Sequence, residues 1–166
     1  MANSTRTVSL DRTDLPTVVA GVLLVNVVGA APALLAGPDS PWFQALEKPA
    51  IYPPGWVFGV VWTTLFTLLG VAVALVWLAG TDRRSVRIAL ALFVLQMIFN
   101  VAWTPAFFAL EDLTLGLLVI VSLWPLVVAT AAAFARVDRR AGALLVPYLL
   151  WVTFAAVLNY QFVVVN

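Results

Sequence analysis

The side chains that could do chemistry in this chain are tryptophans, tyrosines and carboxamides, because its apolar stretches lack the usual acids and bases. No Asp, Glu, Lys or Arg lies in the middle of any long apolar run, and the 166-residue sequence contains no His and no Cys. A charge at the bilayer centre costs about 2.5–3.5 kcal/mol on insertion scales and usually marks an ion or proton pathway. The sequence therefore argues against a pump, a voltage sensor or a carrier that moves protons on carboxylates.

The missing residue types also bound the cofactors and partners. Without His or Cys, the chain cannot form a disulfide, a zinc site of the usual thiolate or imidazole kind, or a haem site with an axial His or Cys. We therefore expect no metal site and no required cofactor. The net charge is only +1, and no basic tract could neutralise a phosphate backbone, so nucleic acid is not expected as a partner.

One polar face lies in the apolar stretch that contains LQMIFNVAWTPAFF. Gln96, Asn100 and Trp103 are spaced four and three residues apart, so they share one side of a helix, and Phe107 follows on the same side. Pro105 removes one hydrogen-bond donor from that helix and predicts a kink. Two interpretations stay open at this point. The amides bond to neighbouring helices, at about 0.6–2 kcal/mol each, or they contact a ligand in a pocket beside the kink.

A second such face lies in the last apolar stretch, PYLLWVTFAAVLNYQFVVVN. Trp151, Ala155 and Leu158 share a helical side, with Asn159 at its flank. The small side chain of Ala155 beside a tryptophan leaves space for the edge of a flat ligand. The alternative is that the aromatic residues form the belts that membrane proteins place at the two bilayer surfaces. Belt residues belong near span ends, and Trp103 and Trp151 lie several residues further in.

Membrane-spanning helices must position these faces. The sequence is 63% hydrophobic and 10% charged, with a mean hydropathy of +1.04, whereas a soluble domain is roughly a quarter charged. A helix needs ~20 apolar residues to cross ~30 Å of hydrocarbon. We predict an all-α fold, an integral membrane bundle of five transmembrane helices, with spans at about 15–36, 53–79, 85–109, 113–135 and 141–164. Residues 1–14 are predicted as a polar tail, and residues 15–166 as a single domain.

The segment 37–52 is predicted as a lid loop over one end of the bundle, with an ordered loop at residues 42–52. It carries Lys48, the only lysine of the chain, and Glu47. Pro53 and Pro54 stand at the start of the second span, and proline suits a first helical turn because it fixes φ and lacks an N–H.

The cations predict the orientation in the membrane. Arginine occurs only in the N-terminal segment and in the second and fourth connections between spans, which lie on one side, and Lys48 is the single cation of the other side. Positive residues favour the cytoplasmic side. We therefore predict a multi-pass cell-membrane protein with a cytoplasmic N-terminus, and with the lid loop and the C-terminus outside.

Three segments together carry a family resemblance. The first matches at Trp42, Leu46, Lys48-Pro49, Pro53-Pro54, Trp56, Trp62 and Gly70; the second at Gln96, Asn100, Trp103, Pro105 and Phe107-Phe108; the third at Pro147-Tyr148, Trp151, Phe154-Ala155 and Leu158-Asn159. In this order the patterns WxxxLxKPxxxPPxW, QxxxNxxWxPxFF and PYLxWxxFAxxLN resemble the TspO/MBR family, the tryptophan-rich sensory or translocator proteins.

The resemblance implies a five-helix bundle, commonly a homodimer, whose first loop closes over an internal pocket. It also implies the ligand: members bind porphyrins, some bind cholesterol or benzodiazepine-type drugs, and bacterial members have been proposed to degrade protoporphyrin. The tryptophans that match Trp62 and Trp151 are those implicated in that breakdown, so these two are the candidate catalytic residues. Taken with the helical faces above, the candidate ligand-binding residues are Trp42, Lys48, Pro49, Trp56, Trp62, Gln96, Asn100, Trp103, Phe107, Trp151, Ala155 and Leu158.

The sequence departs from the animal members at two places. Ile51-Tyr52 stands where they have a Trp-His pair, and no Lys or Arg follows Tyr160. The proposed cholesterol motif needs that basic residue, so sterol recognition through it is not expected. Without His, the porphyrin is expected to be metal-free, or a haem held only by contacts and weak ligands.

Three functions follow as hypotheses. The first is a membrane tetrapyrrole-binding sensor or transport protein, in which Lys48 either pairs with a propionate carboxylate or stays a solvated loop cation. The second is an enzyme that degrades porphyrin with light and oxygen. The third is a regulatory membrane partner that acts through a dimer face at Ala129 and Ala133, two small residues four apart that could instead pack within the subunit.

Overall fold

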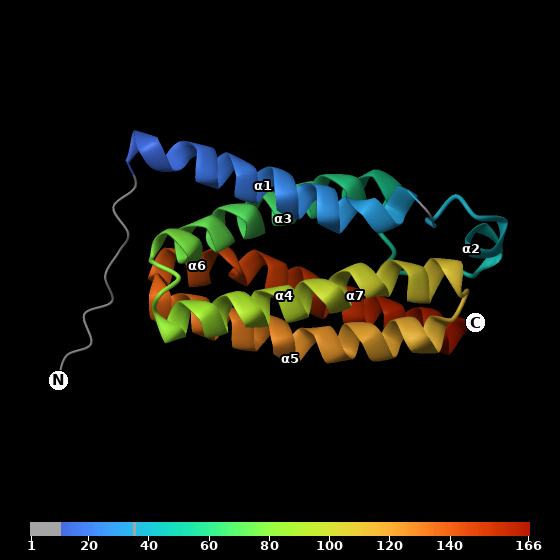
Figure 1. The fold of residues 1–166 in the computed structure, drawn as a ribbon. Coiled ribbons are helices and arrows are strands. Elements are labelled where there is room, and N and C mark those ends of the chain that lie inside the picture. Colours follow the sequence, from blue (N-terminus) through green and yellow to red (C-terminus); the bar gives the residue numbers. More distant parts are fainter. Residues whose placement is uncertain (1–10, 35) are drawn as a thin grey trace.

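The computed structural model describes residues 11–34 and 36–166, which form a bundle of long helices lying side by side (Figure 1). No β-strand occurs in this described part. Five segments are long and apolar enough to cross a membrane, which confirms the predicted fold class: Arg12–Leu34, Gly55–Leu78, Arg84–Ala109, Leu113–Val137 and Arg139–Val165. The predicted polar tail lies mostly outside the described residues.

The helices have the following bounds: α1 Leu15–Ala30, α2 Pro41–Ala45, α3 Gly55–Leu78, α4 Arg84–Thr104, α5 Leu113–Val137, α6 Arg139–Leu144 and α7 Val146–Val165. Short 3-10 turns extend α1 at both ends, at Arg12–Asp14 and Ala31–Leu34. The first span thus begins earlier than predicted, because Asp11 and Asp14 form a capping box: the backbone N–H of Asp11 donates to the carboxylate of Asp14 at 2.9 Å.

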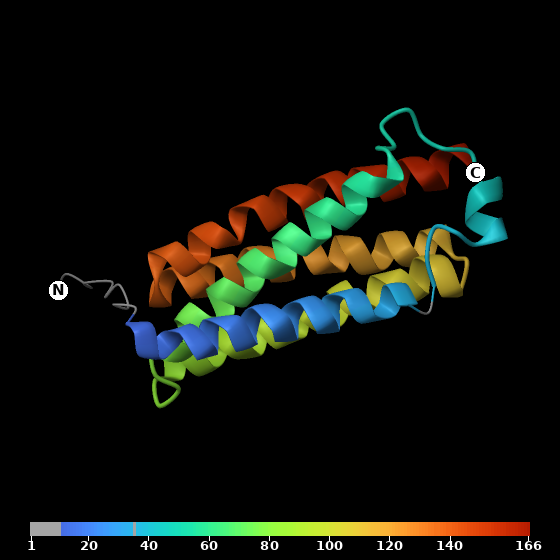
Figure 2. The ribbon, with the colours of Figure 1, turned by 90° about the horizontal axis from the view of Figure 1, so that it is seen from above.

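The lid contains a short helix, so the prediction of a loop over residues 42–52 was wrong at its start. Ser40 begins α2 as its cap, because its hydroxyl accepts a hydrogen bond from the backbone N–H of Phe43 at 3.2 Å, and Pro41 occupies the first turn. Proline and a serine cap are the residues that favour a helix start. In Figures 1 and 2 this helix lies at the end of the bundle opposite the start of α1.

Two of the long spans change their helical form at or near prolines. At Pro105 the α4 helix passes into a π-helical turn, Pro105–Ala109, closed by a hydrogen bond from the N–H of Leu110 to the carbonyl of Pro105 at 2.9 Å. The last span is divided into α6 and α7 at Leu145, just before Pro147. The kink predicted at Pro105 is therefore a widened, π-helical turn. Two phenylalanines of this turn, Phe107 and Phe108, pack against Phe43 of the lid.

Glycines allow the first and second spans to approach closely. A Cβ built on Gly70 would lie 2.4 Å from the Cα of Val22, and one on Gly21 would lie 2.7 Å from the carbonyl oxygen of Gly70. Figure 2 shows α1 and α3 crossing at this level. Ala133, predicted to lie either within the subunit or on a dimer face, is buried in the bundle core, so its close contact is inside the subunit.

The lid and the connection between α3 and α4 lie at opposite ends of the bundle, which gives the predicted orientation a direct test. Asp39 is exposed and makes no cap. In this cysteine-free chain, we expect an Asp39→Cys variant to react with a membrane-impermeant maleimide added to intact cells. A matched Thr81→Cys variant, exposed in the opposite connection, should react only after lysis. The reverse pattern would place the N-terminus outside.

Candidate functional site

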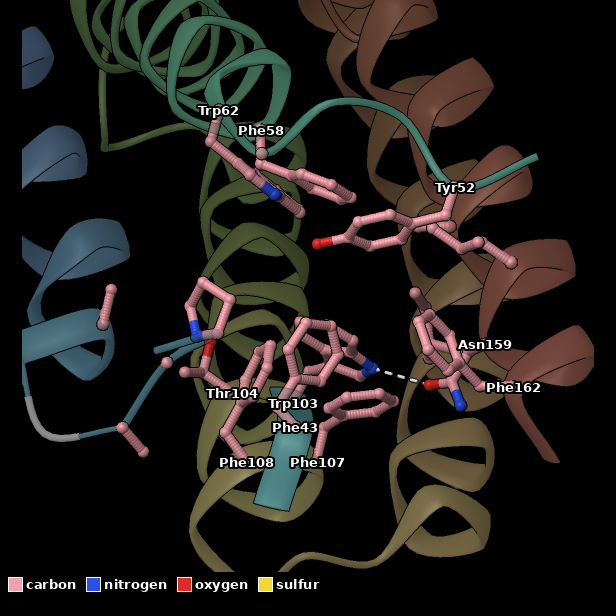
Figure 3. A pocket seen from close by; sticks show the side chains of 18 of the residues that line it. Phe43, Tyr52, Phe58, Trp62, Trp103, Thr104, Phe107, Phe108, Asn159 and Phe162 are labelled. Atoms are coloured by element: carbon pink, nitrogen blue, oxygen red, sulfur yellow. Dashed lines mark hydrogen bonds between the residues drawn. The ribbon is translucent and has the colours of Figure 1, made fainter. Parts of the chain in front are cut away.

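A cavity of about 190 Å³ lies beneath the lid, between α3, α4 and α7 (Figure 3). Its wall is almost wholly aromatic or small and apolar. The residues around it are Ala33, Ala36, Gly37, Pro38, Phe43, Tyr52, Gly55, Phe58, Trp62, Trp103, Thr104, Phe107, Phe108, Ile120, Trp151, Ala155, Leu158, Asn159 and Phe162. The cavity therefore combines residues from the lid, the first to the fifth spans and the π-helical turn.

The cavity brings together half of the predicted ligand-binding set. Those that line it are Trp62, Trp103, Phe107, Trp151, Ala155 and Leu158. Those that do not are Trp42, Lys48, Pro49, Trp56, Gln96 and Asn100. Both candidate catalytic residues are in the first group.

Trp62 and Trp151 meet at the inner end of the cavity. Their ring centroids are 6.5 Å apart and the rings are perpendicular at 89°. Phe58 packs edge-on against Trp151 at 5.9 Å. The indole nitrogen of Trp151 is buried and has no hydrogen-bond partner, and an unpaired buried donor is costly. The N–H of Trp151 is therefore an unsatisfied donor within the wall.

Trp103 is held in place from the opposite wall. Its indole N–H donates to the side-chain oxygen of Asn159 at 3.0 Å, and the amide of Asn159 donates in turn to the carbonyl of Leu113 at 3.0 Å. The ring of Trp103 stacks on Phe107 with centroids 5.1 Å apart. Figure 3 shows this hydrogen bond joining the two sides of the cavity. The hydrogen bond to Asn159 of α7 thus fixes the ring of Trp103 as a flat aromatic surface, against which a planar ligand can stack.

Gln96 and Asn100 face away from the cavity and join α4 to α7. The amide of Asn100 donates to the hydroxyl of Tyr148 at 2.9 Å, and that hydroxyl donates to the side-chain oxygen of Gln96 at 2.9 Å. All three side chains are buried. Of the two interpretations left open by spacing, the structure therefore shows hydrogen bonding between helices.

Lys48 stabilises the lid rather than facing the cavity. Its ammonium donates to the carbonyls of Phe43 and Leu46, the latter at 3.0 Å, and lies 4.1 Å from the ring centroid of Phe43. Burial lowers the pKa of Lys48 below its ordinary value. Pro49, which is buried, accepts from the N–H of Tyr52 at 2.8 Å and shapes the same segment. The two alternatives for Lys48, a propionate partner and a solvated cation, stay predictions.

The other two tryptophans of the predicted set lie outside the cavity. Trp42 packs edge-on against Phe107 at 5.9 Å and supports the wall from behind. Trp56 is 71% exposed on α3, at the end of its span where belt aromatics are expected.

Several phenylalanines and one tyrosine of the wall were not in the predicted set. Phe58 precedes Trp62 by four residues, and Phe162 follows Leu158 by four. Helical spacing from these two predicted residues could therefore have identified both phenylalanines. Phe43 and Tyr52 come from the lid and had no periodic signal. In Figure 3 the hydroxyl of Tyr52 points into the cavity; partial burial raises the pKa of this phenol, so it is protonated at neutral pH and can donate.

The chemistry that this wall offers is stacking and a few hydrogen bonds. Among the residues that the structure describes, no group of three or more His, Cys, Asp or Glu gathers where it could hold a metal ion. Apart from the tryptophans, the residues with polar side chains that line the cavity are Tyr52, Thr104 and Asn159. The site suits a flat, conjugated, mostly apolar ligand that carries an acceptor atom.

Comparisons with known proteins identify the family that the chain resembles. A profile of the TspO/MBR family matches residues 21–165. The tryptophan-rich protein TspO of Chlorobaculum tepidum is 42% identical over 129 residues, covering 78% of this chain and 82% of that protein. The tryptophan-rich sensory protein of Cereibacter sphaeroides is 40% identical over 133 residues, 80% of each chain. The human translocator protein is 37% identical over 121 residues, covering 72% of this chain and 71% of that protein.

Proposed function

Because this chain belongs to the TspO/MBR family of multi-pass membrane proteins, we propose that it binds a tetrapyrrole as a membrane sensor or transport protein. The observation that carries the proposal is the cavity under the lid, whose wall includes the rings of Trp62, Trp103 and Trp151. A porphyrin is flat, conjugated and largely apolar; its propionate carboxylates and the two ring nitrogens without hydrogen are acceptors. The proposal includes the predicted cell-membrane location and a homodimer.

Stacking must supply most of the affinity. An apolar ligand already partitions into lipid, so expulsion of water adds little. Each aromatic pair contributes about 0.5–1.5 kcal/mol beyond area burial, and the cavity offers Trp62, Trp103 and Trp151 to one ligand. A few such pairs favour micromolar binding, which is about −8 kcal/mol.

The size of the cavity restricts how the ligand sits. An apolar cavity of about 150 Å³ holds one benzene ring, and this cavity measures about 190 Å³. A tetrapyrrole has four five-membered rings and their bridges, so the closed cavity receives one edge of it. Full engagement requires the lid to move outward, with Phe43 and Tyr52 following the lid.

Tryptophan fluorescence provides the test. We expect protoporphyrin IX to quench the fluorescence of the detergent-purified protein saturably, with a micromolar dissociation constant. Replacing the indole ring in Trp151→Phe should raise that constant up to about tenfold, since one aromatic pair contributes about 0.5–1.5 kcal/mol. Trp77→Phe, which changes a 56%-exposed tryptophan far from the cavity, is the control. Quenching that never saturates with folded protein would contradict the proposal.

A second candidate function, light-dependent porphyrin breakdown, is favoured by the pairing of Trp62 with Trp151. Both rings line the cavity and lie 6.5 Å apart, so both can contact a bound macrocycle as redox partners, with oxygen as the oxidant. Under light and oxygen we expect the absorption bands of bound protoporphyrin to decay, and the decay to be lost in Trp62→Phe or Trp151→Phe. Equal decay in both variants and in Trp77→Phe would make the protein a bystander.

A further inference from the structure

We infer that Asn166 selects ligands by size, because its side chain clasps the lid over the cavity and admits small flat molecules more readily than a tetrapyrrole. The inference rests on the proposed function, since it concerns access to the same cavity. Its basis is the hydrogen bonding between the lid and the end of α7.

The clasp is a two-way pairing between one carboxamide and one backbone unit. The N–H of Glu47 donates to the side-chain oxygen of Asn166 at 2.8 Å, and the side-chain nitrogen of Asn166 donates to the carbonyl of Glu47 at 3.2 Å. That nitrogen also donates to the carbonyl of Phe162 at 3.1 Å, within the last turn of α7. The carboxamide is therefore oriented by its own helix and satisfies both backbone groups of a lid residue.

This pairing is the polar connection between the lid and the spans. Other hydrogen bonds of the lid, residues 37–52, stay within it among described residues: Gln44 donates to the carbonyl of Pro38, Ser40 caps α2, and Lys48 donates to Phe43 and Leu46. The remaining contacts of the lid with the bundle are apolar, in a cluster of mostly aromatic side chains. Loss of the clasp would leave only those contacts to hold the lid down.

The clasp is coupled to Phe43, the lid residue that closes the cavity. Phe43 is 3% exposed and packs against Phe108 at 5.1 Å and Phe162 at 5.6 Å. Lys48 binds the carbonyls of Phe43 and Leu46 together, so Glu47, which lies between Leu46 and Lys48, moves with α2 as one unit. Releasing Glu47 from Asn166 thus frees Phe43 to leave the cavity.

The size of the closed cavity gives the clasp its selectivity. With Phe43 in place, about 190 Å³ is enough for a bicyclic aromatic molecule and far too little for a macrocycle. A bicyclic probe can bind without displacing Phe43, whereas a tetrapyrrole must displace it. Glu47 and Asn166 are both exposed, so water competes for the clasp and the lid opens with a modest free-energy cost.

The test compares two probes on the full-length protein in detergent, with empty micelles as the blank. In Asn166→Ala we expect the association rate of protoporphyrin IX to rise about tenfold, the effect of two exposed hydrogen bonds, while that of 2-naphthol changes less than about twofold. Asn166→Asp keeps an acceptor for Glu47 and loses the donor, so it should fall between. Gln44→Ala removes a hydrogen bond internal to the lid segment and should change neither rate.

The outcomes separate the clasp from the proposed function. Equal gains for both probes, no gain for protoporphyrin, or failure of 2-naphthol to bind the wild type would overturn size selection. If protoporphyrin binds neither the wild type nor Asn166→Ala, the proposed function fails. The clasp is then tested separately, by hydrogen exchange of the backbone amides of residues 41–48. Faster exchange in Asn166→Ala than in Gln44→Ala supports the clasp, and unchanged exchange refutes it.

Discussion

Replacing Gly70 by leucine is expected to prevent the first two spans from packing and to remove most of the folded protein. A Cβ at this position would lie 2.4 Å from the Cα of Val22 and 2.8 Å from the carbonyl oxygen of Gly21. These are backbone atoms, which cannot rotate away as the end of a side chain can. Overpacking in a core that can adjust costs ~1–3 kcal/mol, and we expect more here because two helices must separate.

The consequence extends to the cavity, since the extension of α1 supplies Ala33 to its wall. Within α1 itself only Val25 is buried, so this helix has few other contacts to compensate for a lost crossing. Spreading the first span from the bundle therefore opens the cavity as well as weakening the fold.

Gly59→Leu is the matched control, the same substitution on the same helix. No atom lies within 4 Å of a Cβ built on Gly59, and the residue is exposed. Leucine is a better helix former than glycine by up to ~1 kcal/mol, so this variant should be neutral or slightly more stable. Thermal unfolding in detergent, followed by circular dichroism, measures both. Equal melting temperatures for the two variants would mean that the helices do not cross at Gly70.

The spans could be predicted because their signal is local. Hydropathy and length identify a membrane helix without knowledge of its neighbours, and prolines mark where a helix starts or changes. The same is true of Trp151, Ala155 and Leu158, which share a face by spacing alone and do meet at the cavity. The short helix α2 was not predicted, because it consists of five residues and a serine cap, too few for a periodic pattern.

Whether an individual residue faces the lipid or the interior of the bundle could not be predicted. A helix that is apolar all round gives no contrast between its lipid face and its buried face. The family resemblance implies a pocket position for Trp56, and the structure places it 71% exposed at the end of α3. Asn100 bonds to Tyr148 from another span, a pairing that only tertiary structure can show. Lys48 donates to carbonyls of its own lid, and the carbonyl of Leu46 lies at the end of α2, where no further helical turn follows.

Replacing Ala155 by phenylalanine is expected to block tetrapyrrole binding without loss of stability. Ala155 lines the cavity one helical turn from Trp151, so a larger side chain there enters the empty space. A phenyl ring is the size of ligand that an apolar cavity of about 150 Å³ accepts, and about 190 Å³ is present. The ring would occupy the place of the ligand edge, and we expect the dissociation constant of protoporphyrin IX to rise at least about tenfold.

The combination of two measurements makes this test specific. A variant that merely disturbs packing loses melting temperature and binding together, whereas one that fills a cavity keeps or raises its melting temperature, because a void deprives the atoms around it of contacts. Ala132→Phe, the same substitution on the exposed face of α5, should leave binding unchanged. If protoporphyrin instead quenches the tryptophan fluorescence of Ala155→Phe as it does that of the wild type, the ligand binds elsewhere. The aromatic wall around Trp62, Trp103 and Trp151 would then be packing and not a binding site.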